Sequence, residues 1–414
     1  MVSVDTVRMA APAPVASISP DLIYADPVHV TVDSRVAEPR RVVALVCEVI
    51  LPFHQGGREH RYHELTKRIS DRADIHVFTM HWWSGPRTRR DNGITFHAIS
   101  RLTPLYVKQR RSLRQAFFFA FSCLRLLRYN FDVLSADNIP FLQLFVLRLV
   151  TLIKRKRLVV TWHEVWGREY WRQYLGIIGI LAWFIEIIAM RMPDQILAAS
   201  PQTADRLRKS LGKRRPISLA IHGIDIDTVE NVSPASRPTD IAVVGRLMEH
   251  KRVDMLLDAI AKLHTDSFNV TCRVIGDGPE WEALHGQAES LGIAESVEFC
   301  RDISEQEDVY RMLKAARVCV FPSAREGFGV AVVEALACGV PVITTSAPDN
   351  LAQYLVERSD RGTVCEPSAD AIASAVKSAL ANPNKGNRHT TPESWLREFS
   401  WDSIARQFSE ALGL

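Results

Sequence analysis

Cysteine pairs at disulfide or metal-ligand spacing are missing from this 414-residue chain. Its seven cysteines are scattered and odd in number, and none forms a C-x-x-C pair. Several lie inside apolar runs, which is typical of buried thiols that stay reduced in the cytoplasm. The cysteines therefore predict a cytoplasmic protein. No group of side chains has the spacing of metal ligands, so no metal site is expected.

The pattern of a secretory signal peptide is also missing from the first 38 residues. They are rich in Ala, Pro, Ser and Val, but they lack a charged start and a continuous apolar core. We therefore expect residues 1–38 to form a mobile N-terminal tail.

The apolar segment Gln173 to Met190 is marginal as a transmembrane helix. It has 18 residues and one charge, Glu186, whereas a membrane span needs about 20 apolar residues. A buried helix of an α/β domain is the preferred prediction, because a strand-like run, DQILAAS, follows it. The alternative is a helix lying on a bilayer beside two basic segments, Lys108 to Arg128 and Lys154 to Arg157.

Charge is distributed unevenly along the chain. Residues 41–190 contain 23 Lys and Arg against 11 Asp and Glu, although the formal net charge of the whole chain is only +4. This asymmetry favours two domains with different partners. Nucleic acid is not expected as one of them, because no nucleic-acid-binding motif accompanies the basic region. An anionic membrane surface or a phosphorylated acceptor fits at least as well.

Two α/β units are expected, because the chain is too long for a single core. The first begins with the buried strand Arg41 to Leu51, followed by a Gly56-Gly57 turn and a helix. The full G-x-G-x-x-G pattern of a dinucleotide site is absent from it. The second unit begins near Asp240, where the strand IAVVGR precedes the helix DMLLDAIAKL.

The most informative stretch lies between Val318 and Thr345. It predicts a buried strand, a glycine-bearing turn, a helix over about Gly329 to Cys338 and a second strand, with Gly339 as the helix C-terminal glycine. Glu326 on the turn and Glu334 on the helix are both placed where an open α/β sheet binds its ligand. Their spacing alone would equally fit an ordinary strand–helix–strand unit with two solvent-facing acids.

With its flanking residues, this stretch resembles the signature of retaining, nucleotide-sugar-dependent glycosyltransferases of the GT-B type, family 4 (glycosyl transferases group 1). That signature is a Glu, a Gly-Phe-Gly turn and a second Glu, here Glu326, Gly327-Phe328-Gly329 and Glu334. The resemblance extends over about residues 41–412 and implies an α/β fold with two Rossmann-like domains facing each other across a cleft. The expected bounds are 1–38 for the tail, 39–227 for the N-terminal acceptor domain, 228–238 for the linker, 239–398 for the C-terminal donor-nucleotide domain and 399–414 for a C-terminal helix that crosses back to the first domain.

The resemblance implies roles for four charged residues. Arg246 and Lys251 match the pair that holds the donor pyrophosphate, and cations there would stabilise the leaving group without a metal or another cofactor. Glu334 is expected to accept hydrogen bonds from ribose hydroxyls. Glu326 is expected to lie near the donor sugar as a catalytic residue, although not as a covalent nucleophile.

The resemblance implies further donor-binding and catalytic positions, where the motifs are less specific. The turn Gly276-Asp277-Gly278 is expected under the base, although such turns are common loop chemistry. Gly327, Phe328 and Gly329 are expected to bind the donor, and the backbone N–H groups of Phe328 and Gly329 would suit sugar hydroxyls or phosphate oxygens. Gly56 and Gly57 would let the first domain approach the diphosphate, or would form an ordinary tight turn. His163, which ends the strand LVVTW, is expected to contact the acceptor or the transferring sugar.

The expected function is a retaining hexosyltransferase that moves a sugar from a UDP- or GDP-sugar to an acceptor hydroxyl. The acceptor would be a lipid-linked or cell-envelope glycan, and the protein would be cytoplasmic, with or without peripheral contact to the inner face of the membrane. Two departures from the family pattern affect this expectation, since His222 replaces the usual Asn and Ser346 to Asn350 replaces a Gly-Gly-x-x-Glu loop. There are two alternatives. One is a nucleotide-sugar epimerase, and the other is an NAD-dependent dehydrogenase or a non-catalytic nucleotide-binding protein.

Overall fold

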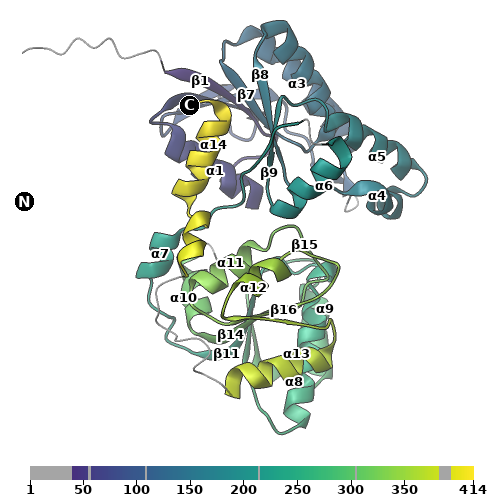
Figure 1. The fold of residues 1–414 in the computed structure, drawn as a ribbon, viewed down its shortest axis with the longest axis vertical. Helices are drawn as coiled ribbons and strands as arrows, with labels where there is room; N and C mark the ends of the chain where they lie inside the picture. Colours follow the sequence, from purple (N-terminus) through teal and green to yellow (C-terminus); the bar gives the residue numbers. More distant parts are fainter. Residues whose placement is uncertain (1–39, 55–56, 108–109, 213–214, 304, 382–392) are drawn as a thin grey trace, which may run out of the picture. The chain divides into compact units, whose positions relative to one another are not determined.

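A computed structural model describes residues 40–54, 57–107, 110–212, 215–303, 305–381 and 393–414. The expected tail, residues 1–38, and Gly56 of the predicted glycine turn lie outside these ranges. The described chain forms two large sheets, each surrounded by helices (Figure 1). This arrangement confirms the predicted fold class of two Rossmann-like α/β units, while the predicted domain bounds stay a prediction.

The first sheet has eight strands and is parallel except at one edge, where β3 runs antiparallel to β4. Its β-branched, apolar strands are buried because helices cover them. The strands in spatial order are β10 (Ile217–Leu219), β9 (Gln195–Ala198), β8 (Arg157–Trp162), β7 (Val133–Asp137), β1 (Arg41–Val46), β2 (Ala73–Met80), β4 (Ile94–Ser100) and β3 (Thr88–Asp91). Its main helices are α1 (Gly57–Ile69), α2 (Leu113–Ser122), α3 (Phe141–Lys154), α4 (Gly167–Leu175), α5 (Ile178–Ala189) and α6 (Pro201–Leu211).

The β3–β4 hairpin was not predicted. Its turn is Asn92-Gly93, and both residues have positive φ, 48° and 78°. This is the two-residue turn whose geometry follows the twist of paired strands, and Asn-Gly is its commonest sequence. The dipeptide was therefore a usable signal for the hairpin.

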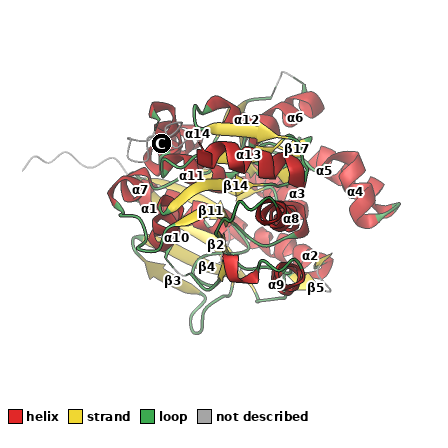
Figure 2. Cartoon of the chain, turned by 90° about the horizontal axis from the view of Figure 1, so that it is seen from below, coloured by secondary structure: helices red, strands yellow, loops and turns green. Residues whose placement is uncertain are grey.

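The second sheet has six parallel strands in a doubly wound order. Two of them, β11 (Thr239–Val244) and β14 (Ala316–Phe321), lie side by side in Figure 2. Helix α8 packs against α9 and α13, whereas α10 packs against α7 and α11. The strands in spatial order are β13 (Val297–Cys300), β12 (Cys272–Ile275), β11 (Thr239–Val244), β14 (Ala316–Phe321), β16 (Val342–Thr345) and β18 (Gly362–Cys365). The helices are α7 (Ile226–Asn231), which overlaps the predicted linker, α8 (Val253–Thr265), α9 (Trp281–Ser290), α10 (Gln306–Lys314), α11 (Val330–Ala337), α12 (Gln353–Arg358) and α13 (Ala369–Ala381).

The last helix, α14 (Trp401–Leu412), packs against α1, far from it in sequence (Figure 1). Arg68 of α1 donates a 2.9 Å hydrogen bond to Asp402, and the Arg61 guanidinium lies 5.7 Å from the ring centroid of Phe408. Ser400 caps the helix by accepting from the backbone N–H of Ser403. The strongly amphipathic sequence of α14 is therefore buried on one face against the first α/β unit.

The prediction of one buried helix over Gln173 to Met190 is wrong. The segment forms the end of α4 and then α5, with a break at Gly176, whose φ is 63°. Much of α5 is exposed, including 69% of Ile178, 61% of Leu181 and 50% of Phe184. None of the helices in the described ranges has both the length and the apolarity that crossing a membrane would require.

Buried Glu186 explains the single charge in this segment. Its carboxylate accepts hydrogen bonds from the backbone N–H groups of Trp166 and Gly167 at 2.9 and 3.1 Å, and from Nε1 of Trp171 at 2.9 Å. It thereby satisfies donors at the start of α4 from the neighbouring helix α5. Burial raises the pKa of Glu186, although these hydrogen bonds oppose the shift.

Candidate active site

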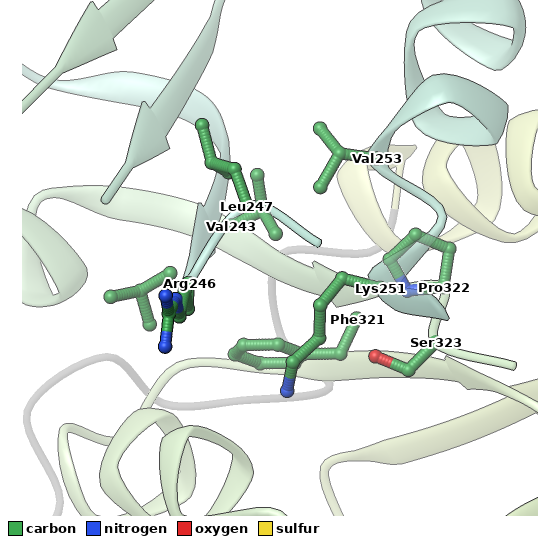
Figure 3. Close-up of a pocket in the computed structure, with 10 residues that line it drawn as sticks. Val243, Arg246, Leu247, Lys251, Val253, Phe321, Pro322 and Ser323 are labelled. Atoms are coloured by element: carbon green, nitrogen blue, oxygen red, sulfur yellow. The ribbon is translucent and has the colours of Figure 1, made fainter. Parts of the chain in front are cut away.

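Arg246 and Lys251 lie beside one recess at the carboxyl end of β11. Arg246 follows Gly245, and Lys251 ends a short 3-10 turn, Glu249–Lys251. Both line the recess together with Phe321 and Ser323, which end and follow β14 (Figure 3). The recess has a volume of about 10 Å³, enough for about one water molecule. The two predicted phosphate-binding cations therefore come together at a shallow surface site.

Lys251 and Glu326, two predicted catalytic residues that are 75 positions apart, form a direct ion pair. Glu326 belongs to β15 (Arg325–Glu326), and its carboxylate also accepts a 3.0 Å hydrogen bond from the Ser323 hydroxyl. Both partners of the ion pair are mostly buried, with 24% and 13% of their side chains exposed. Because both side chains are largely removed from water, the charge-assisted pair orients both groups more firmly than it would at a fully exposed surface.

The turn Gly276-Asp277-Gly278 packs against the loop that carries Arg246. A Cβ on Gly276 would lie 2.0 Å from the carbonyl oxygen of Gly245, and one on Gly278 would lie 2.2 Å from that of Leu247. Leu247 in turn donates its backbone N–H to the Asp277 carbonyl oxygen at 2.9 Å. These glycines are thus required for the close approach of two loops. The predicted contact with a base stays a prediction.

Glu334 lies on α11 and is held by two side chains of α10. The Gln306 amide donates to its carboxylate at 2.8 Å and the Tyr310 hydroxyl donates at 3.5 Å. Burial raises the pKa of Glu334 to about 7, and the Tyr310 hydrogen bond opposes the shift. Glu334 therefore gains or loses its proton near neutral pH.

The Gly-Phe-Gly turn has a packing role at two of its three positions. Gly329 has a φ of 91°, and a Cβ there would lie 2.6 Å from the Cβ of Ala352. The Phe328 ring packs against Phe399, with ring centroids 5.6 Å apart. At Gly327 a Cβ would have no described heavy atom within 4 Å. Gly327 is therefore the position of the turn where the described chain leaves room for a ligand.

His163 belongs to a cluster at the carboxyl ends of β7 and β8. Its Nε2 lies 2.7 Å from Oδ1 of Asp137, which also accepts a 2.7 Å hydrogen bond from the Tyr62 hydroxyl. Arg58 of α1 lies 3.4 Å from the other carboxylate oxygen. Burial alone would raise the pKa of Asp137, but His163 and Arg58 outweigh it and the pKa is lowered.

A second acid, Glu48, extends this cluster. It is fully buried two positions after β1 and accepts a 2.9 Å hydrogen bond from the Gln115 amide. It also forms ion pairs with Arg111 and, at 3.5 Å, with Arg58. Burial lowers the pKa of Arg58, but Asp137, Glu48 and Glu59 outweigh it and raise the pKa.

Sequence reasoning missed Arg58, Glu48 and Asp137. The usable signal was an acid at the carboxyl end of each of two buried strands, since Asp137 ends β7 and Glu48 lies two positions beyond β1. The carboxyl ends of neighbouring parallel strands lie at one edge of a sheet.

Gly57 begins α1 next to this cluster, and its carbonyl oxygen lies 2.9 Å from Nε2 of His222. A Cβ on Gly57 would make only an ordinary 3.6 Å contact with the same imidazole, so packing does not require glycine there. Burial lowers the pKa of His222 to about 4, so this imidazole is neutral near pH 7.

One ion pair links the His163 segment to the Glu326 segment. Arg325 donates to both carboxylate oxygens of Glu164, at 2.6 Å each, and its guanidinium lies 4.4 Å from the ring centroid of Tyr170. These contacts raise the pKa of Arg325 despite its partial burial. Since Glu164 follows His163 and Arg325 precedes Glu326, the pair brings the two predicted catalytic segments together.

Within the described residues, no group of three or more His, Cys, Asp or Glu side chains could hold a metal ion.

Two family models match consecutive parts of the chain. The model described as Glycosyltransferase Family 4 matches residues 55–228, and the one described as Glycosyl transferases group 1 matches residues 226–391. The chain belongs to the group 1 glycosyltransferases of the GT-B type. The second match includes Lys251, Glu326 and Glu334.

Curated relatives of the family match shorter regions. A GDP-mannose-dependent alpha-(1-6)-phosphatidylinositol dimannoside mannosyltransferase of Mycobacterium tuberculosis is 30% identical over 178 residues, which is 42% of this chain and 45% of the relative. A D-inositol 3-phosphate glycosyltransferase of Mycobacterium sp. (strain JLS) is 37% identical over 165 residues, 37% of each chain. The chain therefore spans less than half the length of these two relatives.

Solved structures match nearly the whole chain in fold. A sucrose-phosphate synthase from Thermosynechococcus elongatus has a TM-score of 0.74 at 20% identity, covering 90% of this chain and 98% of the other. Anabaena HepE in complex with UDP-glucose has a TM-score of 0.68 at 18% identity, with 90% and 100% covered. At these identities the matches establish the shared GT-B fold.

Proposed function

We propose that this protein is a retaining hexosyltransferase that moves a hexosyl group from a nucleotide sugar to an acceptor hydroxyl. The observation that carries the proposal is the Lys251–Glu326 ion pair beside Arg246, at the carboxyl edge of the second sheet. A UDP- or GDP-sugar is the proposed donor. The names of relatives support this choice, since one depends on GDP-mannose and another was crystallised with UDP-glucose.

Departure of the nucleoside diphosphate is the step in which Arg246 and Lys251 would act. Negative charge grows on the diphosphate as its bond to the anomeric carbon breaks, and two preorganised cations stabilise that charge. Lys251 would then donate hydrogen bonds to both the phosphate and Glu326. Glu326 would thereby stay beside the sugar, where positive charge develops on the anomeric carbon. We expect turnover to persist in EDTA, because these side chains supply the positive charge.

His163 is proposed to contact the acceptor or the transferring sugar. The Asp137 carboxylate accepts the proton on Nε2, so a neutral His163 ring would present Nδ1 as an acceptor. Arg58 and Tyr62 hold Asp137 in place, which fixes the orientation of the imidazole. His163 would thereby position a hydroxyl group, with Asp137 acting through it.

The proposed acceptor is a lipid-linked or cell-envelope glycan at an anionic membrane surface, with the enzyme peripheral on the cytoplasmic face. Exposed apolar side chains on α2, α3 and α5 support this, together with the basic residues of the same region. The names of relatives point in the same direction, since they include phosphatidylinositol mannoside mannosyltransferases and a lipopolysaccharide core glycosyltransferase.

A two-step experiment tests the proposal. A thermal-shift panel of UDP-, GDP- and ADP-sugars identifies the donor nucleotide, and released nucleoside diphosphate is then measured with and without glycolipid acceptors. We expect one nucleotide sugar to stabilise the protein and the acceptor to accelerate release. An epimerase would convert the sugar without acceptor-dependent release. Stabilisation by NAD, but by no nucleotide sugar, would contradict the proposal.

A further inference from the structure

An apolar cavity of about 350 Å³ lies among α2, α3, α4 and α5. Its size is within the range of small-molecule sites. Aliphatic and aromatic side chains make up most of its wall, including Leu113, Phe141, Trp171 and Ile185. The proposed donor chemistry uses none of these residues.

The helices around the cavity expose many large apolar side chains, and α3 packs against both α2 and α5. We name this set of side chains the apolar helix face. Its side chains are between 46% and 77% exposed, whereas soluble proteins seldom expose so many large apolar groups together. Exposed cations, among them Arg114, Arg125 and Arg128, come from the same segments. The apolar helix face consists of Leu113, Phe117, Phe118, Phe121, Leu149, Leu152, Ile153, Ile178, Leu181, Phe184 and Ile188.

Arg111 connects the cavity with the His163 cluster. Its side chain lines the cavity and forms an ion pair with buried Glu48. Glu48 also pairs with Arg58, and Arg58 pairs with Asp137, the partner of His163. A continuous series of ion pairs therefore runs from the apolar cavity to the proposed acceptor position.

We propose that this cavity holds the hydrocarbon chain of a phosphate-bearing lipid acceptor, taken from an anionic bilayer on which the apolar helix face rests. This inference rests on the proposed function and names its acceptor class. The lipid phosphate would lie near Arg111, which shares its charge between the phosphate and Glu48. The acceptor hydroxyl would then extend toward His163.

A hydrocarbon chain fits this cavity better than a peptide does. A peptide would carry backbone N–H and C=O groups into a largely apolar space, where unpaired polar groups are costly. A lipid chain carries no such groups, and its anionic head complements the basic side chains at the rim. A second copy of the protein would cover the apolar helix face without accounting for a cavity that reaches Arg111.

Lipid quenching tests the cavity without relying on turnover. Trp166 and Trp171 line it, so vesicles whose phosphatidylglycerol carries brominated acyl chains should quench their fluorescence. The measurement is made in a Trp183→Phe background, because Trp183 lies on α5 and would report surface contact. We expect quenching with brominated phosphatidylglycerol and little binding to vesicles of phosphatidylcholine alone.

Two neighbouring substitutions separate the cavity from the surface. Ala182→Phe fills the cavity, whereas Leu181→Ser alters only the exposed side of the same helix. Ala182→Phe should keep vesicle binding but lose most of the tryptophan quenching, and should lower transfer to a lipid acceptor at least tenfold. Leu181→Ser should weaken vesicle binding several-fold. Both variants should keep the donor-induced thermal shift of the parent, which also shows that they are folded.

Several outcomes would overturn the inference. If Ala182→Phe quenches and transfers like the parent, no chain enters the cavity. A concentration-dependent dimer that excludes vesicles would assign the apolar helix face to a second copy. If the donor panel fails while cavity quenching holds, the proposed function fails and the lipid site stands. If only the quenching fails, the lipid site fails and the glycosyltransferase stands.

Discussion

Lys251 illustrates how a single residue gains a functional meaning from its partner. By sequence it is a loop cation that the family resemblance assigns to the donor pyrophosphate, and the structure pairs it with Glu326 and places it beside Arg246. A donor diphosphate bound beside Arg246 would compete with Glu326 for the Lys251 ammonium group. The pairing therefore restrains Lys251 where the proposed donor phosphate would lie.

Lys251→Ala should lower kcat by about 10² to 10³-fold, because one preorganised charge partner of the leaving group is lost. Steady-state kinetics with the identified donor measure the effect. Lys262→Ala is the matched control, since Lys262 also pairs with an acid, Asp370, but on the outside of α8. Turnover that is equal in the two variants would remove Lys251 from the catalytic machinery.

Glu334 should make donor binding depend on pH. Its pKa of about 7 lies above the ordinary 4.5 because burial disfavours the carboxylate. Since ribose hydroxyls donate to the ionised form, affinity should rise about tenfold between pH 6 and 8. Affinity is measured by calorimetry with a nucleotide sugar. A free nucleoside diphosphate is unsuitable, because its terminal phosphate also titrates near pH 6 and would add its own pH dependence.

Glu334→Gln supplies the control for this pH dependence, because its affinity should not change with pH over the same range. The effect on folding has the opposite sign. The folded state holds the proton more tightly than the unfolded state, so the stability from this group is present below about pH 4.5 and is lost as pH rises through 7. A pH-independent affinity of the parent protein would argue against the ribose contact.

At the scale of elements, contacts between loops and helices explain residues whose sequence meaning was ambiguous. The Gly276-Asp277-Gly278 turn looks like ordinary loop chemistry, yet two of its residues must be glycine for the Arg246 loop to pack against it. Glu186 looks like an isolated charge in an apolar segment, yet it holds α4 and α5 together.

Gly278→Ala should destabilise the protein by about 1 to 3 kcal/mol, because the added methyl group would overlap the Leu247 carbonyl oxygen. It should also weaken donor binding by displacing Arg246. Gly286→Ala is the control, since Gly286 lies inside α9 with no described atom near its Cβ position, and alanine there should stabilise by up to about 1 kcal/mol. Urea unfolding and donor-dependent thermal shifts distinguish the two substitutions.

Glu186→Ala should cost about 3 kcal/mol, because it leaves donors of Trp166, Gly167 and Trp171 without their acceptor. Hydrogen exchange should show loss of protection confined to α4 and α5. Exposed Glu169→Ala on α4 should be nearly neutral. Unchanged protection in the Glu186 variant would mean that helix packing alone maintains the pair.

At the scale of the whole molecule, long-range pairs join parts that the sequence separates widely. Arg325 and Glu164 are 161 positions apart, and α14 returns to α1 at the opposite end of the described chain. The Trp401 ring of α14 leaves no room for a side chain at Gly223, where a Cβ would lie 2.4 Å away. These contacts tie the C-terminal segment to the first α/β unit.

Arg325→Ala and Glu164→Ala should each lower Tm by about 2 °C, and the double variant should lower it no further, because both remove the same interaction. Differential scanning calorimetry measures the three changes. The Arg206–Asp349 pair is the control, since 37% and 63% of its side chains are exposed and its removal should have little effect. Additive losses in the Arg325 series would show that the two residues act independently.

How much could be predicted depended on whether the determining contacts were local. The strand, turn and helix around Glu326 and Glu334 were predicted correctly because glycine positions and apolar runs specify them over short distances. The Asp137, Glu48 and Arg58 cluster was missed because its members come from different strands and a helix. The exposure of α5 was mispredicted because an apolar sequence indicates that a segment avoids water, but it does not indicate which surface covers that segment.

The amino-acid sequence by itself determined the fold class, the family signature and the identity of the proposed donor-site residues. The α/β fold class follows from short-range periodicity and turn chemistry, whereas the donor-site residues follow from the resemblance of the motif to the family signature. Only the tertiary structure decided that Lys251 meets Glu326, that Asp137 orients His163, and that four helices enclose an apolar cavity beside Arg111. Parallel strands bring distant residues to one sheet edge, and that convergence depends on strand order, which no local pattern encodes.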